Sequence, residues 1–220
     1  MKRQQLHAHP ADAPDDAQVA DDVKALLAVG DREAARTRFE MLVDRHQRRA
    51  ARIADAYLRD RADADEAVQD AFVKAFVHLP SYRAAGRFDL WLTQILVHGC
   101  MDRLRARRSQ WRWLQPTAVD SCGGVEHQPS HASSPEAAML AAERDAQLQS
   151  AIAALPERQR SVVILHQLEG HKTHEVGTML GVSEATVRVH LFRALRALRA
   201  RLSATRRERR RMVQSLGGAP

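Results

Sequence analysis

The sequence is poor in cysteine, in aromatic residues and in long apolar runs, and each scarcity excludes a class of protein. Its 220 residues include two cysteines, Cys100 and Cys122, which exclude a disulfide framework, a Cys-ligated zinc finger and a C-x-x-C redox pair. No apolar run approaches the roughly 20 residues that a transmembrane helix needs, and the N-terminus has no secretory signal segment. The sequence therefore predicts a protein of the reducing cytoplasm, without direct membrane insertion.

Patterns typical of catalytic or metal-binding sites are also missing. There is no Gly-rich phosphate loop, no H-E-x-x-H pair and no Ser or Cys nucleophile in a recognisable frame. His127 and His131 are four residues apart, but they lie in a segment without helical periodicity, where that spacing does not converge on a metal. We therefore expect no enzymatic activity, no metal and no cofactor.

The charge, a net +7, is distributed unevenly along the chain. Residues 101–115 carry five arginines against Asp102 alone, and residues 188–211 carry ten arginines against Glu208 alone. Residues 1–31 carry six aspartates against three basic residues. Two separate basic segments favour an extended polyanion as partner, most simply nucleic acid. Solvated basic helix faces are the alternative.

The spacing of apolar residues predicts an all-α protein with two small helical domains joined by a flexible linker. The N-terminal 30 residues, rich in Asp, Ala and Pro, are expected to be disordered. Gly30 and Asp31 are expected to stop this segment and cap the first helix, and Asp63 to start the next. The expected segments are an acidic N-terminus (1–30), a first domain (31–113), a linker rich in Pro, Gly, Ser and His (114–135), a second domain (136–204) and a basic tail (205–220).

The most specific local pattern lies in the second domain and predicts a helix-turn-helix. Gly181 suits the left-handed position that ends the first helix, and Ser183 suits the cap of the second. Gly177 lies where the two helices must approach closely. In the second helix, Val187, Leu191, Leu195, Leu198 and Leu202 form the expected buried stripe.

Such a helix enters the major groove of DNA with its N-terminal residues at base edges. Arg188 can bind guanine through two hydrogen bonds, and Phe192, one turn further, can contact a thymine methyl group. Arg193, Arg196 and Arg199 are better placed for phosphates.

Aromatic residues accompany the first arginine cluster. Tyr82, Phe88 and Trp91 precede it, and aromatic rings beside cations are typical of single-stranded nucleic acid binding, since bases stack on the rings. The alternative, favoured for Trp91, is that these rings belong to the core. Cys100 is expected to be a small buried residue, with a redox role as the alternative.

The chain resembles the extracytoplasmic-function (ECF) group of bacterial RNA polymerase sigma factors. The resemblance lies in D-A-D-E-A-V-Q-D-A-F (Asp63–Phe72), F-D-L-W-L-T-Q-I (Phe88–Ile95) and D-R-L-R-A-R-R (Asp102–Arg108) of the first domain. In the second domain it lies in L-P-E-R-Q-R-S-V (Leu155–Val162), L-E-G (Leu168–Gly170) and L-G-V-S-E-A-T-V-R (Leu180–Arg188).

The resemblance implies sigma regions 2 and 4, and with them partners and binding residues. The implied partners are core RNA polymerase (the clamp helices of the beta-prime subunit and the flap of the beta subunit), promoter DNA and an anti-sigma factor. The implied polymerase-binding residues are Asp65, Gln69, Asp70, Val73 and Lys74. Those implied for the duplex minus-thirty-five element are Glu184, Thr186, Arg188, Phe192, Arg193 and Arg196. Those implied for the single-stranded minus-ten element are Tyr82, Arg83, Arg87, Phe88, His98, Arg103, Arg105, Arg107 and Arg108.

Two residues depart from the family pattern. His98 stands where the family often has Asn, so the base preference at the minus-ten element does not carry over. Lys172 replaces the usual Ser or Thr cap before the helix-turn-helix, and we expect Thr173 to take that role.

The expected function is promoter recognition, promoter melting and transcription initiation together with core polymerase. The alternative is a helix-turn-helix regulator that binds duplex DNA without polymerase, a class that has no need of the first domain's pattern.

Overall fold

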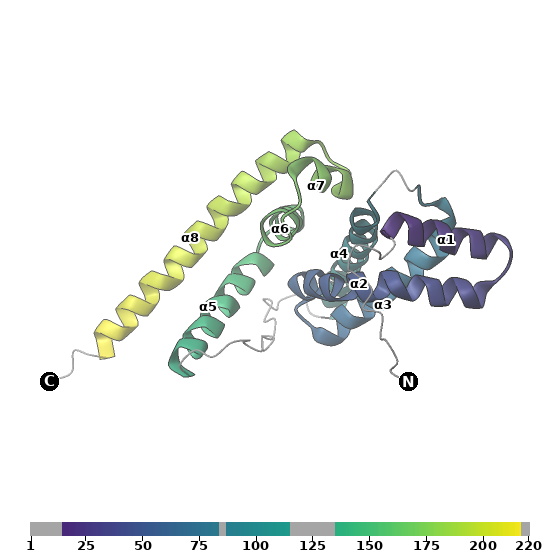
Figure 1. Ribbon diagram of the computed structural model, residues 1–220. Helices are drawn as coiled ribbons and strands as arrows, with labels where there is room; N and C mark the ends of the chain where they lie inside the picture. Colours follow the sequence, from purple (N-terminus) through teal and green to yellow (C-terminus); the bar gives the residue numbers. More distant parts are fainter. Residues whose placement is uncertain (1–14, 84–86, 115–134, 217–220) are drawn as a thin grey trace, which may run out of the picture.

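The computed structural model describes residues 15–83, 87–114 and 135–216, and every regular element in these ranges is helical (Figure 1). The elements fall into two groups. The N-terminal domain consists of α1 (Asp16–Ala28), α2 (Arg32–Leu58), α3 (Arg61–His78), the 3-10 turn η1 (Leu79–Ser81) and α4 (Phe88–Leu114). The C-terminal domain consists of α5 (Pro135–Ala153), α6 (Glu157–Val163), the π-helical turn η2 (Ile164–Leu168), α7 (Thr173–Leu180) and α8 (Glu184–Leu216). Nearly all of the predicted linker, residues 115–134, falls outside the described residues.

Helix α1 corrects the expectation that the N-terminal 30 residues are disordered. The Asp15 carboxylate accepts a hydrogen bond from the Gln18 backbone N–H at 2.7 Å and so caps the helix. Val19, Ala20 and Val23 are fully buried, and α1 packs on α2 and against η1. The acidic residues that suggested disorder face basic residues of α2: Asp22 binds Arg38, and Asp16 binds Arg45.

Helices α2, α3 and α4 form the rest of the N-terminal domain around the predicted apolar stripes. Phe39 of α2 packs edge-on against Phe72 and Phe76 of α3, with ring centroids 6.5 and 5.3 Å apart. The predicted cap Asp31 accepts from the Ala34 N–H at 3.0 Å. The predicted start of α3 was wrong by two residues, because Asp60 is the cap and accepts from the Asp63 N–H at 3.0 Å.

The C-terminal domain is dominated by α8, which packs on α6, α7 and α5 (Figure 1). At 1.5 Å per residue, its 33 residues extend about 50 Å. Residues 205–216, expected as a basic tail, continue this helix, and residues 217–220 fall outside the described residues. In the parts of the chain that the structure describes, no helix is both long and apolar enough to cross a membrane.

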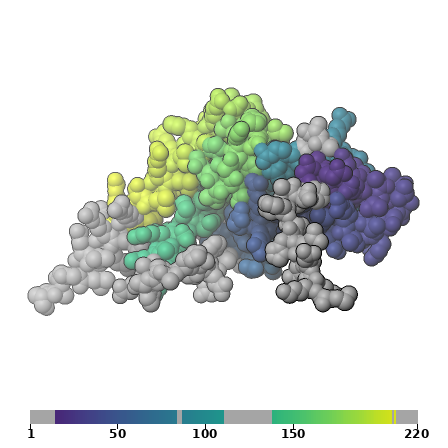
Figure 2. Space-filling model, viewed as in Figure 1, coloured from purple at the N-terminus to yellow at the C-terminus, as the bar shows by residue number. Residues whose placement is uncertain are grey.

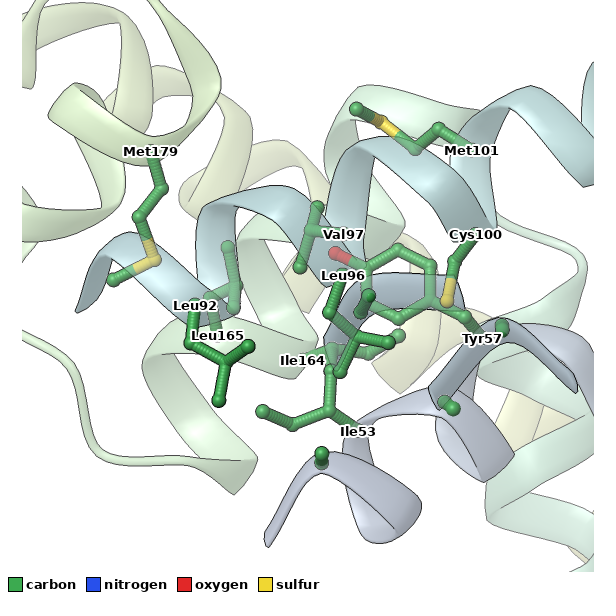
Figure 3. Close-up of a cluster of buried hydrophobic side chains, with 14 of the residues drawn as sticks. Ile53, Tyr57, Leu92, Leu96, Val97, Cys100, Met101, Ile164, Leu165 and Met179 are labelled. Carbon is green, nitrogen blue, oxygen red and sulfur yellow. The ribbon is translucent and has the colours of Figure 1, made fainter. Parts of the chain in front are cut away.

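The two domains pack against each other, an arrangement that the sequence did not predict. Helix α4 contacts α7, and α2 contacts η2. In the space-filling view the green α6–α7 region lies directly against the teal and blue N-terminal domain (Figure 2). One continuous apolar cluster runs from Ile53 of α2 and Leu96 of α4 to Ile164 and Leu165 of η2 (Figure 3).

Candidate nucleic-acid interface

The turn between α7 and α8 has the geometry predicted for a helix-turn-helix. Gly181 adopts the left-handed conformation with φ of 64°, and the Ser183 hydroxyl accepts from the Thr186 N–H at 3.2 Å. A Cβ built on Gly177 would lie 2.8 Å from the carbonyl oxygen of Val182, so the helices pack too closely for any side chain there. Val187, Ala194 and Leu198 of α8 are buried.

The start of α7 differs from the prediction that Thr173 caps it. The Lys172 backbone N–H donates to the Glu175 carboxylate at 2.9 Å, while the Thr173 hydroxyl donates to Glu184 at 2.6 Å. The side chain of Glu175, the third residue of α7, therefore caps the N-terminus of this helix. Thr173 instead joins the two helices of the motif.

The contact between Thr173 and Glu184 also involves Arg188, the residue that the sequence predicts to contact a base. The Arg188 guanidinium donates to Glu184 at 2.6 Å, so Thr173 and Arg188 share one carboxylate. The hydrogen bond from Thr173, together with the charge of Arg188, holds the pKa of Glu184 below its ordinary value. Glu184 thus positions Arg188 at the exposed N-terminal end of α8.

The other residues predicted for the duplex differ in how they are placed. Phe192 is 69% exposed, a high value for a large apolar ring, and lies one turn beyond Arg188. Arg193 and Arg196 are also exposed. The hydroxyl of Thr186 is turned toward Ser183 at 2.8 Å and takes part in the cap.

Two of the aromatic residues predicted to stack on single-stranded bases belong to the core. Tyr82 and Phe88 are 6% and 2% exposed, and their rings pack on each other with centroids 5.8 Å apart. Lys24 of α1 lies over the Tyr82 ring, 5.1 Å from its centroid. Burial, together with the nearby Asp16, raises the pKa of Tyr82. In this structure neither ring is open to a base.

Trp91, for which the sequence favoured a place in the core, packs against the core but is only partly buried. It packs on Tyr82 and Phe88 with centroids 4.9 and 5.8 Å away, and it borders a depression between α3 and α4.

We call this depression the α3–α4 groove; it consists of two adjoining cavities of about 290 and 360 Å³. The residues common to both cavities are Lys74, Ile95, Gly99 and Asp102. His98 lines it, and its Nδ1 lies 2.8 Å from the Gln94 carbonyl oxygen. Because that oxygen only accepts, Nδ1 donates and Nε2 remains available.

The sequence did not single out His78 and Gln94, which line this groove, and it assigned Lys74, which also lines it, to polymerase binding. The α4 residues that line the groove recur every three or four positions, from Trp91 to Asp102, and this helical periodicity was the available signal.

The arginines predicted for the single strand are held by carboxylates. Arg103 binds Glu66 at 3.0 Å and also Asp70, and the hydrogen bond from Arg103 to Glu66 raises the pKa of this guanidinium. Arg107 binds Asp63 at 3.1 Å. Arg87 and Arg105 each bind one carboxylate of either domain: Arg87 binds Asp89 and Glu175, and Arg105 binds Asp102 and Glu157. Arg108 reaches Glu157. Arg83 is exposed.

The residues predicted to bind polymerase lie on one exposed side of α3. Asp65, Gln69, Asp70, Val73 and Lys74 are all exposed, as is Val77 one turn beyond Val73. Val73 is 63% exposed, in agreement with its expected position outside the core. We call this surface the α3 face.

Among the described residues, the structure shows neither a metal-binding cluster nor a reactive cysteine. Among them, no group of three or more His, Cys, Asp or Glu side chains could hold a metal ion. Cys100 is fully buried, and burial raises the pKa of its thiol to about 12. This thiol therefore stays protonated and unreactive at neutral pH, as expected for a packing residue.

Taken by itself, the fold defines a class: a helical protein with a helix-turn-helix, whose reading helix exposes arginines and a phenylalanine. Comparison with known sequences defines the family. The family model "Sigma-70 region 2" matches residues 42–110, and "Sigma-70, region 4" matches residues 145–198. The chain is 34% identical over 184 residues to the ECF RNA polymerase sigma factor SigM of Mycobacterium tuberculosis, covering 81% of each chain. It is 31% identical over 173 residues to the ECF RNA polymerase sigma-E factor of Escherichia coli, covering 77% of this chain and 86% of that protein.

Solved structures share this fold. CnrH, in its complex with the cytosolic domain of CnrY, shares 25% identity with a TM-score of 0.58, covering 86% of this chain and 97% of that one. RpoE of Bartonella quintana, in complex with the anti-sigma factor NepR, has a TM-score of 0.61 at 19% identity, covering 75% and 96%. The chain belongs to the ECF RNA polymerase sigma factors, non-catalytic subunits that direct RNA polymerase to promoters.

Proposed function

We propose that the N-terminal end of α8 reads a duplex minus-thirty-five element, with Arg188 as its principal base contact. The supporting observation is the Thr173–Glu184–Arg188 chain, which fixes an exposed guanidinium where a helix-turn-helix meets base edges. A guanidinium held by a carboxylate at the correct end of the helix loses little side-chain entropy when it binds guanine. Phe192 adds apolar contact one turn further, and Arg193 and Arg196 bind phosphates.

The minus-ten element is assigned to the α3–α4 groove and the arginines beside it. Trp91 offers a partly exposed ring for stacking, and Lys74, Arg103 and His98 offer hydrogen-bond donors or acceptors within the same groove. The buried rings of Tyr82 and Phe88 pack against Trp91 and do not contact the strand. Each stacked base contributes about 1–3 kcal/mol toward strand separation. His98, with Nε2 available, contributes to base choice.

Core polymerase is assigned to the α3 face, and a regulatory partner to the family's anti-sigma class. The exposed Val73 and Val77 among charged residues favour protein binding at that face. Two structural relatives were solved with their regulators: CnrH with CnrY and RpoE with NepR. We expect this chain to have such an anti-sigma partner and, like the polymerase it serves, to work in the cytoplasm.

The test is reconstitution with bacterial core RNA polymerase, followed by run-off transcription from a promoter library. Co-elution with polymerase and initiation from a shared two-part sequence is the expected result. Arg188→Ala should then cost about 1–3 kcal/mol on the upstream element and relax selection at one base pair.

The matched control is Arg201→Ala, which removes an exposed arginine about three and a half turns further along α8. It should weaken binding to all sequences equally or not at all, with a shallower salt dependence. Equal losses for Arg188→Ala on cognate and scrambled DNA would show that Arg188 contacts only phosphate.

A further inference from the structure

Two large apolar side chains stand exposed among the arginines of α8. Val189 is 46% exposed and Phe192 is 69% exposed, and Ala185 is exposed as well. These three positions are four and three residues apart, so they lie one above another on one face of the helix. The buried positions Val187 and Ala194 lie on the opposite face. Single exposed apolar residues are ordinary, whereas adjoining ones mark an interaction surface. We call Ala185, Val189 and Phe192 the α8 ridge.

The α8 ridge runs through the middle of the face proposed to meet the duplex. It lies at the end of α8 that adjoins α7 (Figure 1). At about 100° per residue, Arg188 lies on one side of the ridge and Arg193 on the other. Glu184, which accepts from Arg188 at 2.6 Å, lies beyond Arg188 as seen from the ridge. The guanidinium of Arg188 is therefore drawn away from Val189 and leaves that side chain open.

The charges around the ridge favour DNA over a protein as its partner. In the part of the chain that the structure describes, Arg193, Arg196 and Arg199 are exposed, and no ion pair joins them to a carboxylate. On the α3 face, by contrast, the exposed Val73 has the carboxylates of Asp65 and Asp70 on the same side of its helix. An apolar strip flanked by unpaired arginines fits a groove lined by phosphates.

The chemistry of the major groove defines what an apolar strip can recognise there. Each base pair presents hydrogen-bonding groups in this groove, and thymine adds the one apolar group, its C5 methyl. Valine and phenylalanine cannot pair with the hydrogen-bonding edges, so covering those edges leaves buried donors and acceptors without partners. Contact with a methyl group instead removes apolar surface of both molecules from water. The α8 ridge therefore favours base pairs that carry a thymine methyl.

We propose that Val189 is a specificity-determining residue that binds a thymine methyl group, with Phe192 binding the methyl group of the next base pair. The two residues are about 4.5 Å apart along the helix axis, close to the rise of about 3.4 Å between successive base pairs. The element read by α8 then contains two successive A·T pairs beside the guanine that binds Arg188. This inference rests on the proposed function, which places α8 in the major groove of a duplex element.

The test removes single methyl groups from the DNA. Deoxyuridine lacks only the C5 methyl of thymidine and keeps its base pairing and all its hydrogen-bonding groups. The chain in complex with core polymerase is bound to the promoter selected from the library, with each thymine of the upstream element replaced in turn. Affinity should fall about fourfold at each of two neighbouring base pairs, the effect of one methyl group lost from an apolar contact. Other positions should not respond.

A variant of the protein then assigns one of these methyl groups to Val189. Val189→Ala should weaken binding to the thymine promoter about fourfold and should no longer respond to uracil at one of the two positions, while the other still responds through Phe192. The matched control is Val29→Ala, the same change at a valine that is 78% exposed and lies at the end of α1. It should keep the wild-type response to uracil at both positions.

Three outcomes would overturn the proposal while leaving the proposed function intact, provided that Arg188→Ala still weakens binding to the element. They are a selected element without successive A·T pairs, no response to uracil at any position, and an equal response of Val189→Ala and wild type to every uracil. A loss of affinity of Val189→Ala for core polymerase itself would assign the ridge to a protein contact and would also overturn it. If Arg188→Ala has no effect either, the proposed function fails, and this inference fails with it.

Discussion

At the scale of single residues, replacing glycine by alanine should have opposite effects on stability at Gly177 and at Gly99. A methyl group at Gly177 would lie 2.8 Å from the Val182 carbonyl oxygen, whereas one at Gly99, inside α4, would meet no atom within 4 Å. Gly177→Ala should therefore lower the free energy of unfolding by about 1–3 kcal/mol, because backbone must move to relieve the overlap. Gly99→Ala should raise it by about 0.5–1 kcal/mol, because alanine costs less backbone entropy in a helix. Urea unfolding of both variants measures the two changes in the free energy of unfolding. Two changes of the same sign would contradict the close approach of the chain at Gly177.

The same scale shows which site residues could be predicted from the sequence. Ser183, Gly181 and Gly177 were predicted correctly, because each position is dictated by backbone geometry within one turn of chain. Tyr82 and Phe88 were assigned to DNA because they precede arginines, but neighbours in sequence do not reveal that α1 covers the Tyr82 ring. Their burial depends on tertiary packing, which the local pattern does not contain.

At the scale of elements, the difference between local sequence pattern and tertiary packing also explains why α1 and η2 were not predicted. The sequence of α1 is rich in Asp and Ala, and its apolar stripe is short, so its composition resembles disorder. It is stabilised by packing on α2 and by the pairs from Asp22 to Arg38 and from Asp16 to Arg45. Such stabilisation from distant residues overrides weak local preference. The π-helical turn Ile164–Leu168 likewise has no local signature, although its two buried residues lie at the domain contact.

The element that most directly tests polymerase binding is α3. Val73→Glu should weaken binding to core polymerase by roughly tenfold or more, because a carboxylate replaces an apolar contact at the interface, and tenfold corresponds to about 1.4 kcal/mol. Thermal stability should not change, since Val73 is 63% exposed.

Val29→Glu is the matched control for this test, because Val29 caps α1 and is 78% exposed, away from the α3 face. Competition binding against a labelled sigma factor on core polymerase measures both variants. Unchanged affinity for Val73→Glu would remove the α3 face from the interface.

At the scale of the whole molecule, the domain contact contains a buried histidine that links stability to pH. His171 is 3% exposed, and its Nε2 lies 2.8 Å from the Arg49 guanidinium of the other domain. Asp89 of α4, Glu169 and Glu175 are the other charged groups that face it, and its carbonyl oxygen contacts His166. Burial, followed by the charge of Arg49, outweighs these three carboxylates and lowers the pKa of His171 below its ordinary value of 6.5. The folded protein therefore keeps His171 neutral at a pH where the unfolded chain binds a proton.

The free energy of unfolding should accordingly be largest above about pH 6.5 and should fall as the pH drops from there toward the lower pKa of folded His171. Burial by itself would raise the pKa of Asp89 and of Glu175. The Asp89 carboxylate accepts hydrogen bonds from Arg87, and the Glu175 carboxylate accepts one from the Lys172 backbone N–H. Together with nearby positive charges, these hydrogen bonds hold both pKa values below the ordinary range, so both carboxylates stay ionised in this window. His171→Gln can still accept from Arg49 but cannot titrate, so it should flatten the decline between pH 7 and 5. His174→Gln changes an exposed histidine three residues further along the chain, in α7, and should leave the wild-type slope unchanged. Thermal unfolding at several pH values measures all three proteins, and parallel curves for wild type and His171→Gln would show that this histidine does not couple the domain contact to pH.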